Sequence, residues 1–287
     1  MKNKFLSTAL ILGALYGTAN AAPITSPIYM PEQGKISTDL KVGFTKSKFD
    51  KKPTGQSDKL EESWNLDAEG KMGLTDEIAL NYGFDFDFAR KIRNGDKSAK
   101  FTDFYLGLTG RVVNAEDNKL DIILNVGQEE DTIVSLQDQV YAELAVRYGL
   151  DLDMYNLGLS VGGKYINDYE NKESNNAGSY KVERGYLVSF KLDNEFIFDE
   201  FTVGLDLFYN INGDIKEKTD GITTAKFGSY NEYGFNVDAN YALTEDNNYV
   251  GLYFAMAQSD IKGPKDSTQQ YKEPTEYKFG LKFVSEF

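Results

Sequence analysis

Closely spaced carboxylates are the feature of this sequence with the clearest potential for chemistry. Asp67 and Glu69, and likewise Asp85 and Asp87, stand two residues apart. In a strand, residues i and i+2 share one face, so each pair could serve in acid–base catalysis or hold a calcium ion. Acids recur throughout the chain, however, and no nucleophile with a base and an orienting group accompanies these pairs. We therefore expect no catalysis, no bound metal and no cofactor.

The composition narrows the possible functions further. The sequence contains neither histidine nor cysteine, so the preferred ligands of zinc are missing and disulfide bonds are excluded. Its 45 acidic and 31 basic residues give a formal charge of −14. Such acidity argues against a nucleic-acid partner, because nucleic-acid binding needs a basic surface that neutralises phosphates.

Apolar and polar residues alternate along most of the chain, which is typical of strands with one apolar face. In the clearest stretch, Ile78, Leu80 and Tyr82 alternate with Asn81 and Gly83. Twelve such strands can be traced from residue 35 to residue 287. They are separated by short connections (75–77, 114–118, 151–155, 199–200, 244–248) and by longer polar ones (50–59, 91–100, 128–138, 167–180, 212–226, 260–274). The turn at 199–200 competes with one at 193–194, and we favour the former.

The short and long connections alternate, as they do in transmembrane β-barrels with short periplasmic turns and longer extracellular loops. No proline lies between Pro53 and Pro264, as expected if prolines are confined to tails and loops of a sheet without edges. The fold class predicted is therefore all-β: a closed antiparallel transmembrane β-barrel of about 12 strands. The alternative is a soluble β-sandwich or a lipocalin-like barrel, but the polar lanes hold too many charges and glycines for the dry surroundings of a packed core.

The last eleven residues indicate where such a barrel would reside. Tyr277, Phe279, Leu281 and Phe283 form one lane, which continues to a terminal Phe287. The pattern resembles the closing strand of Gram-negative outer-membrane β-barrels, and the chain looks like a small porin-like member of that superfamily. The resemblance implies that these five residues are a signal for the barrel-assembly machinery, and that outer-membrane lipid and lipopolysaccharide surround the barrel. The outer-membrane phospholipase and omptin protease families use a catalytic histidine, which this chain lacks, so the resemblance does not imply an enzyme.

The beginning of the chain supports export to the cell outer membrane. Residues 1–21 combine a basic start, an apolar centre and the ending Ala19-Asn20-Ala21, which is typical of a cleaved signal peptide. Its removal would take away two lysines and no acid, shifting the charge from −14 to −16. Residues 22–34, with three prolines, are interpreted as a periplasmic leader before a barrel domain of residues 35–287. This leader is either loose or tucked into the lumen as a partial plug.

The inward-facing lanes carry charges of both signs, and acids outnumber bases. Twelve strands should leave a narrow aqueous passage. We therefore expect passive diffusion of small polar solutes or ions with a weak preference for cations, through a monomer. Two alternatives remain: the charges pair and brace a closed wall, or the barrel is structural or adhesive and acts through its extracellular loops. The candidate pore-lining residues are Asp39, Lys41, Asp67, Glu69, Lys71, Asp85, Asp87, Asp103, Arg111, Asp121, Glu143, Arg147, Lys164, Lys191, Asp206, Asp238, Lys278 and Lys282.

Overall fold

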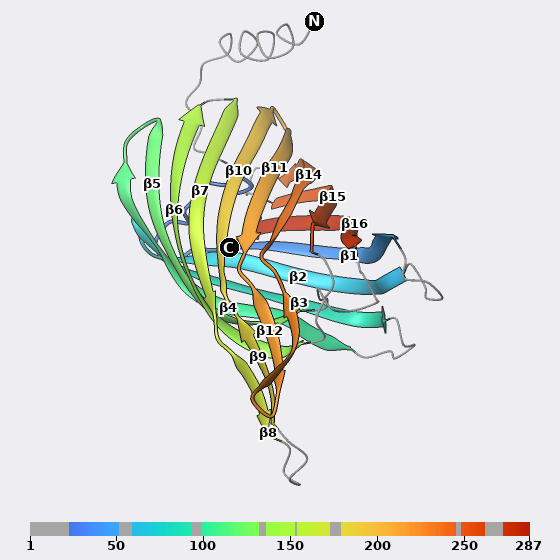
Figure 1. Ribbon diagram of the computed structural model, residues 1–287. Coiled ribbons are helices and arrows are strands. Elements are labelled where there is room, and N and C mark those ends of the chain that lie inside the picture. Colours follow the sequence, from blue (N-terminus) through green and yellow to red (C-terminus); the bar gives the residue numbers. More distant parts are fainter. Residues whose placement is uncertain are drawn as a thin grey trace, which may run out of the picture.

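The computed structural model describes residues 23–51, 59–92, 99–131, 136–152, 154–172, 179–244, 248–261 and 272–287. Twelve antiparallel strands in this part of the chain close into one barrel (Figure 1). They are β1 (Ile36–Lys51), β2 (Lys59–Thr75), β3 (Ile78–Ile92), β4 (Lys100–Asn114), β5 (Asn118–Asp131), β6 (Leu136–Leu152), β7 (Tyr155–Ile166), β10 (Tyr186–Phe198), β11 (Phe201–Asn212), β14 (Tyr230–Thr244), β15 (Asn248–Ser259) and β16 (Lys272–Glu286). The predicted fold class and strand number are confirmed. The described residues include no helix long and apolar enough to cross a membrane.

The barrel closes where β16 pairs with β1. Val42 lies opposite Leu281, and Phe44 lies opposite Phe279 with their rings 5.8 Å apart. At the end of this seam the amide of Ile36 donates to the carbonyl of Phe287 at 2.8 Å, and the amide of Phe287 donates back at 3.0 Å. The terminal residue is thus part of the closing ladder. A closed ladder satisfies the backbone of every strand, which a wall in contact with lipid requires.

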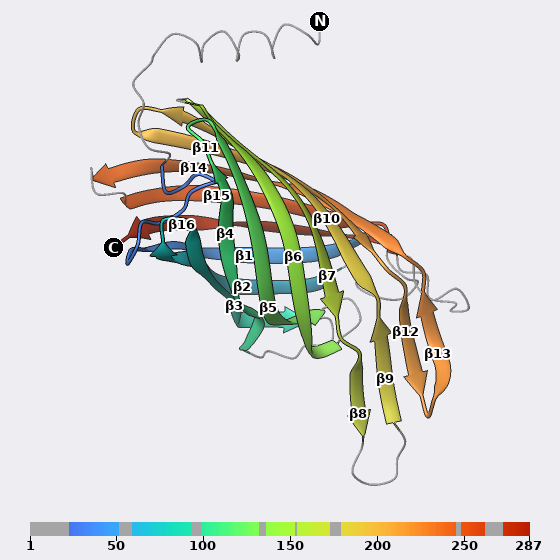
Figure 2. The same cartoon turned by 90° about the vertical axis from the view of Figure 1, so that its left-hand side faces the viewer.

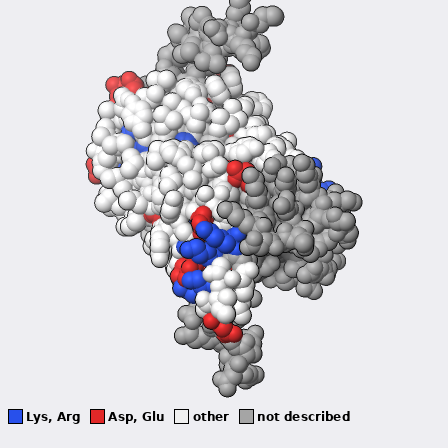
Figure 3. All heavy atoms as spheres, in the orientation of Figure 1, with Lys and Arg blue, Asp and Glu red and all other residues white. Residues whose placement is uncertain are grey.

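The outward lanes of the barrel are apolar and exposed. Leu106, Leu144 and Leu252 have exposed fractions of 48%, 56% and 64%, far above those of core leucines. Figure 3 shows a wall with few charged side chains on the visible face of the barrel. The strands are 12 to 17 residues long, so each exceeds the ~10 residues that a tilted strand needs to cross a bilayer. The outer surface therefore suits a lipid environment.

The two ends of the barrel differ. One end carries Phe287 and the short turns, and we call it the turn end; the other is the loop end. The turn predicted at 199–200 is confirmed, because Asp199 adopts a positive φ of 48° between β10 and β11. The connection predicted at 128–138 was too long, since β5 continues to Asp131 and β6 begins at Leu136. The predicted connections at 50–59, 91–100 and 260–274 lie largely outside the described residues.

One proline departs from the prediction. Pro274 was assigned to a loop, but it lies in β16 opposite Phe49 of β1. On its other side the described ladder with β15 begins only at Thr275, which pairs with Gln258. A missing N–H is tolerated near the start of a strand, where the ladder has a neighbour on one side only.

A second, four-stranded sheet extends from the loop end, and we call it the projecting sheet (Figure 2). It contains β8 (Tyr169–Lys172), β9 (Ser179–Arg184), β12 (Ile215–Thr219) and β13 (Ile222–Phe227). The connections predicted at 167–180 and 212–226 contain strands of this sheet, which the prediction did not include. Val182, which was assigned to a barrel strand, is instead buried in β9 with Ile215, Tyr230 and Ile261. Short strands among charged residues gave too weak an alternation to be recognised.

Glycines mark the junction between the two sheets. Gly185 separates β9 from β10, and residues 213–214 separate β11 from β12. A Cβ atom on Gly213 would stand 3.2 Å from the backbone nitrogen of Tyr186, so the two crossing backbones approach closely here. Such an approach favours residues without a side chain.

Charge pairs hold the projecting sheet together and tie it to the barrel. The Glu183 carboxylate accepts hydrogen bonds from Lys218 at 2.6 Å and from Lys181 at 3.2 Å. These bonds hold the pKa of the Glu183 carboxyl below its usual value of 4.5. Arg184 reaches the inner wall of the barrel, where it pairs with Glu129 of β5 at 3.1 Å. Figure 3 shows basic and acidic side chains gathered on the projecting sheet.

Candidate functional site: the lumen and the N-terminal segment

The barrel encloses a polar cavity of about 890 Å³. Among the described residues that line it, ten are acidic and six are basic. The cavity extends from the N-terminal residues Thr25 and Pro27 to Glu232 and Glu276, which lie towards the loop end. It is therefore an interior surface of the barrel rather than a shallow surface depression.

The structure places the predicted pore-lining residues on the inner side of the wall. Those that line the cavity are Asp39, Lys41, Asp67, Glu69, Lys71, Asp103, Arg147, Lys191, Asp206, Asp238, Lys278 and Lys282. The remaining six lie on the same inward lanes. Asp85 pairs with Lys278 at 3.7 Å, Asp87 is buried, Asn125 donates to Glu143 at 3.2 Å, and Lys164 pairs with Glu129 at 2.7 Å. Arg111 and Asp121 pair with each other at 2.8 Å.

Many of the lumen charges pair with charges on neighbouring strands. Lys282 lies between Asp39 at 3.3 Å and Asp238 at 3.2 Å. Lys41 contacts Glu69 at 2.8 Å and Asp39 at 3.4 Å. These pairs link β14, β16, β1 and β2, so part of the charge braces the wall.

A row of carboxylates crosses four consecutive strands. Asp67 lies opposite Asp85, Asp85 opposite Asp103, and Asp103 opposite Glu129. Like charges directly opposite one another destabilise a sheet. Lys278, which pairs with Asp85, and Lys164, which pairs with Glu129, offset part of this repulsion. The row places four carboxylates on one side of the lumen, and Lys278, Lys164 and Arg184 pair with two of them.

Aromatic side chains lie across glycines on neighbouring strands and narrow the lumen. A Cβ atom on Gly83 would stand 2.2 Å from the ring of Tyr105, and one on Gly127 would stand 2.6 Å from the ring of Tyr141. The Tyr253 hydroxyl occupies the corresponding space over Gly43. Each glycine thus provides the room in which a ring packs flat against the wall.

The N-terminal segment (residues 23–34) lies inside the turn end of the barrel. Ile28 is only 2% exposed and Ile24 only 7%. Ile28 packs against Gly149 of β6, and Pro27 packs near Gly158 of β7. The leader was expected to be either loose or tucked into the lumen. Its described residues are tucked into the lumen.

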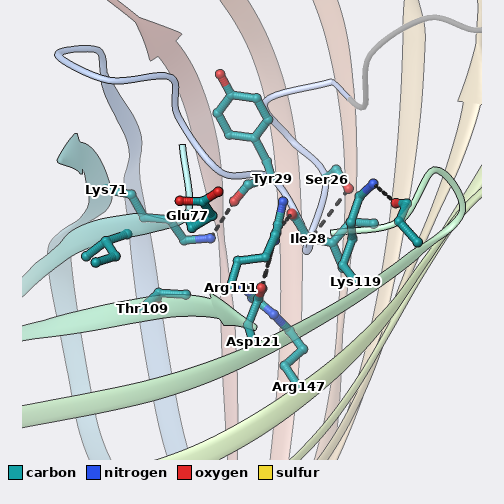
Figure 4. Close-up of polar contacts among 12 residues, drawn as sticks. Ser26, Ile28, Tyr29, Lys71, Glu77, Thr109, Arg111, Lys119, Asp121 and Arg147 are labelled. Carbon is teal, nitrogen blue, oxygen red and sulfur yellow. Dashed lines mark hydrogen bonds and ion pairs between the residues drawn. The ribbon is translucent and has the colours of Figure 1, made fainter. Parts of the chain in front are cut away.

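Hydrogen bonds to its backbone fix this segment in place (Figure 4). Lys71 donates to the carbonyl of Tyr29 at 2.7 Å, and Arg111 donates to the carbonyl of Ile28 at 2.5 Å. The Tyr29 hydroxyl donates to the carboxylate of Glu286. At the far end the amide of Gly34 donates to the carbonyl of Gly73 at 2.8 Å. The segment is thus held by apolar packing in its first half and by polar contacts from Ile28 to Gly34.

A basic cluster lies beneath this segment. Arg111 and Arg147 both pair with the buried carboxylate of Asp121, each at 2.8 Å, as Figure 4 shows. Lys71 completes the cluster through its hydrogen bond to the Tyr29 carbonyl, so three cations lie beneath the segment and two of them share one carboxylate. This end of the lumen is locally positive although the lining as a whole is acidic.

Several interior residues were not identified from the sequence. Asp193 and Glu195 line the cavity. They were not identified because a turn at 193–194 competed with the one at 199–200. Glu129 was placed in a connection that proved to be strand, and its pairing with Arg184 depends on the unrecognised β9. The alternation that continues from Leu187 to Glu195 could have identified Asp193 and Glu195 as inward-facing.

The structure also places the five residues of the predicted assembly signal. Tyr277, Phe279, Leu281 and Phe283 follow one another along β16, and Phe287 is 71% exposed at its end. Their recognition by an assembly machinery stays a prediction. Among the described residues, no group of three or more acidic side chains is arranged to hold a metal ion.

No protein-family model and no curated protein sequence matches this chain. Solved structures do share its architecture. An outer-membrane channel from Pseudomonas putida F1 is 15% identical and superposes with a TM-score of 0.63, covering 93% of this chain and 100% of that one. The toluene transporter TodX of Pseudomonas putida is 10% identical with a TM-score of 0.49, covering 94% of each chain. The outer-membrane protease OmpT of Escherichia coli is 11% identical with a TM-score of 0.36, covering 92% of this chain and 100% of the protease.

Only the first of these superpositions is close enough to support an argument, and at 15% identity it concerns the fold alone. It agrees with the closed barrel described above. The chain has the fold of an outer-membrane β-barrel with twelve strands.

Proposed function

We propose that this protein is an outer-membrane channel for passive diffusion of small polar solutes or ions, and that its N-terminal segment narrows the periplasmic end of the lumen. The observation that carries the proposal is the polar cavity of about 890 Å³ inside a closed barrel. Mixed charges are costly in a dry interior but not around water. An interior lined in this way, behind an apolar outer wall, suits a water-filled passage.

The acidic excess of the lining supports a weak preference for cations. The carboxylate row from Asp67 to Glu129 and the acids Asp193 and Asp206, which lie opposite each other, place negative charge on two sides of the lumen. Rings of acidic side chains favour cations in channels. Lys278 and Lys282 weaken this preference because they neutralise individual acids along the wall.

A structural or adhesive barrel with a closed lumen is the second candidate. Two observations favour it: the N-terminal segment packs into the turn end, and the projecting sheet presents a folded surface at the loop end. In this alternative the ion pairs serve only to brace the wall.

Conductance separates the two candidates. The refolded protein lacking residues 1–21 is inserted into planar bilayers and compared with a variant that also lacks residues 22–34. A channel gives discrete current steps that become larger or more persistent in the shorter variant, with a reversal potential that favours cations under a salt gradient. A barrel that remains folded on heat-modifiability gels but is silent in both forms supports the structural alternative.

A further inference from the structure

The basic cluster beneath the N-terminal segment has donors that this fold does not use fully. Arg111 and Arg147 share one carboxylate, that of Asp121, and Lys71 lies beside them with its ammonium on the Tyr29 carbonyl. Glu69 of β2 also lies nearby, and it is engaged by Lys41 at 2.8 Å. The cluster therefore keeps an excess of positive charge.

The oxygen atoms that these cations contact in the N-terminal segment are consecutive main-chain carbonyls. Arg111 donates to the carbonyl of Ile28 and Lys71 to that of Tyr29. Both cations therefore contact neutral oxygen acceptors in the segment. A charged acceptor forms hydrogen bonds about twice as strong as those of a neutral carbonyl, so these donors suit an anion better than the groups they hold.

Arg147 provides a separate indication. One of its terminal nitrogens donates to Asp121 at 2.8 Å, but its Nε atom is buried without a hydrogen-bond partner among the described residues. A buried donor left without an acceptor destabilises the fold, so a ligand that supplies an acceptor is favoured at this position. Arg147 and Lys71 also line the cavity, so a solute inside the lumen reaches them directly.

We propose that Lys71, Arg111 and Arg147 form an oxyanion site, which the N-terminal segment occupies with the carbonyls of Ile28 and Tyr29. A solute that carries a carboxylate or a phosphate group displaces the segment from this site and so opens the periplasmic end. This inference rests on the proposed channel function, and it assigns a chemical class to the solute that releases the segment. The acidic cavity above the site passes cations, while the site itself responds to anions.

The test uses the absence of cysteine from the sequence. Ser26 is 6% exposed in the N-terminal segment, so a Ser26→Cys variant carries one thiol that reports whether the segment is seated. The rate of labelling by a bulky water-soluble maleimide is measured in detergent micelles with increasing inorganic phosphate, chloride being adjusted to constant ionic strength. We expect labelling to accelerate about tenfold and to saturate. A parallel series with succinate distinguishes carboxylates from phosphate.

Two further substitutions make the test specific. Arg147→Gln removes a ligand of the site, so measured against its own basal labelling rate it should raise the half-saturating phosphate concentration about tenfold. Lys191→Gln removes another cation of the same cavity and should respond as the parent does. Lys71→Met serves as a second site variant, in which the basal rate should rise and the phosphate response should disappear.

The inference is overturned if phosphate has no effect at constant ionic strength, or if Arg147→Gln responds exactly as Lys191→Gln does. Its failure can be distinguished from failure of the channel proposal, because labelling requires no current. A conducting protein whose labelling ignores both phosphate and succinate overturns only the oxyanion site. A silent barrel with saturable phosphate-dependent labelling overturns only the channel and supports the site.

Discussion

Gly149 controls whether the N-terminal segment can occupy its seat. A Cβ atom at this position would stand 2.4 Å from Cγ2 of Ile28, which is closer than real contacts come, and 3.2 Å from its Cβ, which is a tight contact. Ile28 is almost fully buried and has little room to rotate away. We therefore predict that Gly149→Val expels Ile28 from its seat and loosens the segment while leaving the barrel closed.

The magnitude follows from the packing. Overfilling a tightly packed site costs about 1–3 kcal/mol, and this cost weighs only on the seated state because the displaced segment avoids the clash. A penalty of about 2 kcal/mol raises the ratio of displaced to seated segment roughly 30-fold, since every 1.4 kcal/mol is a factor of ten.

The maleimide labelling rate of Ser26→Cys measures this shift directly. Gly163→Val is the matched control, because a Cβ atom on Gly163 of β7 meets nothing within 4 Å. Gly149→Val should label about 30 times faster than the parent, and Gly163→Val should label at the parent rate. Equal rates in all three proteins would refute the account of how the segment is seated.

Three other predictions concern assembly, stability and pH. Phe287→Ala should reduce the amount of barrel in the outer membrane several-fold by quantitative blotting without changing its refolding from urea, and unchanged amounts in cells would contradict an assembly role. Asp121→Asn leaves Arg111 and Arg147 without the carboxylate that they share, so it should lower the free energy of unfolding in urea by about 3 kcal/mol. An unchanged urea midpoint would show that these charges are fully solvated. Hydrogen bonds from Lys218 and Lys181 lower the pKa of the Glu183 carboxyl. The stability that these bonds give the projecting sheet is therefore present above pH 4.5, and it is lost as the pH falls through the lower pKa of the folded state. An NMR titration of the Glu183 carboxyl should show a midpoint below 4.5 that rises in Lys218→Met, and a midpoint at or above 4.5 would be contradictory.

The barrel could be predicted from the sequence because alternation with period two acts locally. Each strand such as β3 needs only its own residues to show which side is apolar, and the alternation of short and long connections orders the strands. The terminal aromatic lane of β16 marked the closing strand for the same reason. Side-chain direction follows from this parity, so the inward charges were located without knowledge of their partners.

The N-terminal segment and the projecting sheet could not be derived in this way. The seat of Ile28 depends on the absence of a side chain at Gly149, far along the chain, and on donors from β2 and β4. Proline spacing in residues 22–34 indicates an extended conformation but does not indicate a binding surface. The projecting sheet is assembled from pieces of two separate connections, and its core unites Val182 with Ile215 and Ile261. Contacts of this range leave no local pattern.

The most direct test of the central claim is single-channel recording of the protein with and without residues 22–34. The account predicts small or infrequent current steps in the longer form. In the shorter form it predicts larger, persistent steps, with a cation-leaning reversal potential under a salt gradient. A folded barrel that carries no current in either form would contradict the claim that the lumen is a passage for small polar solutes.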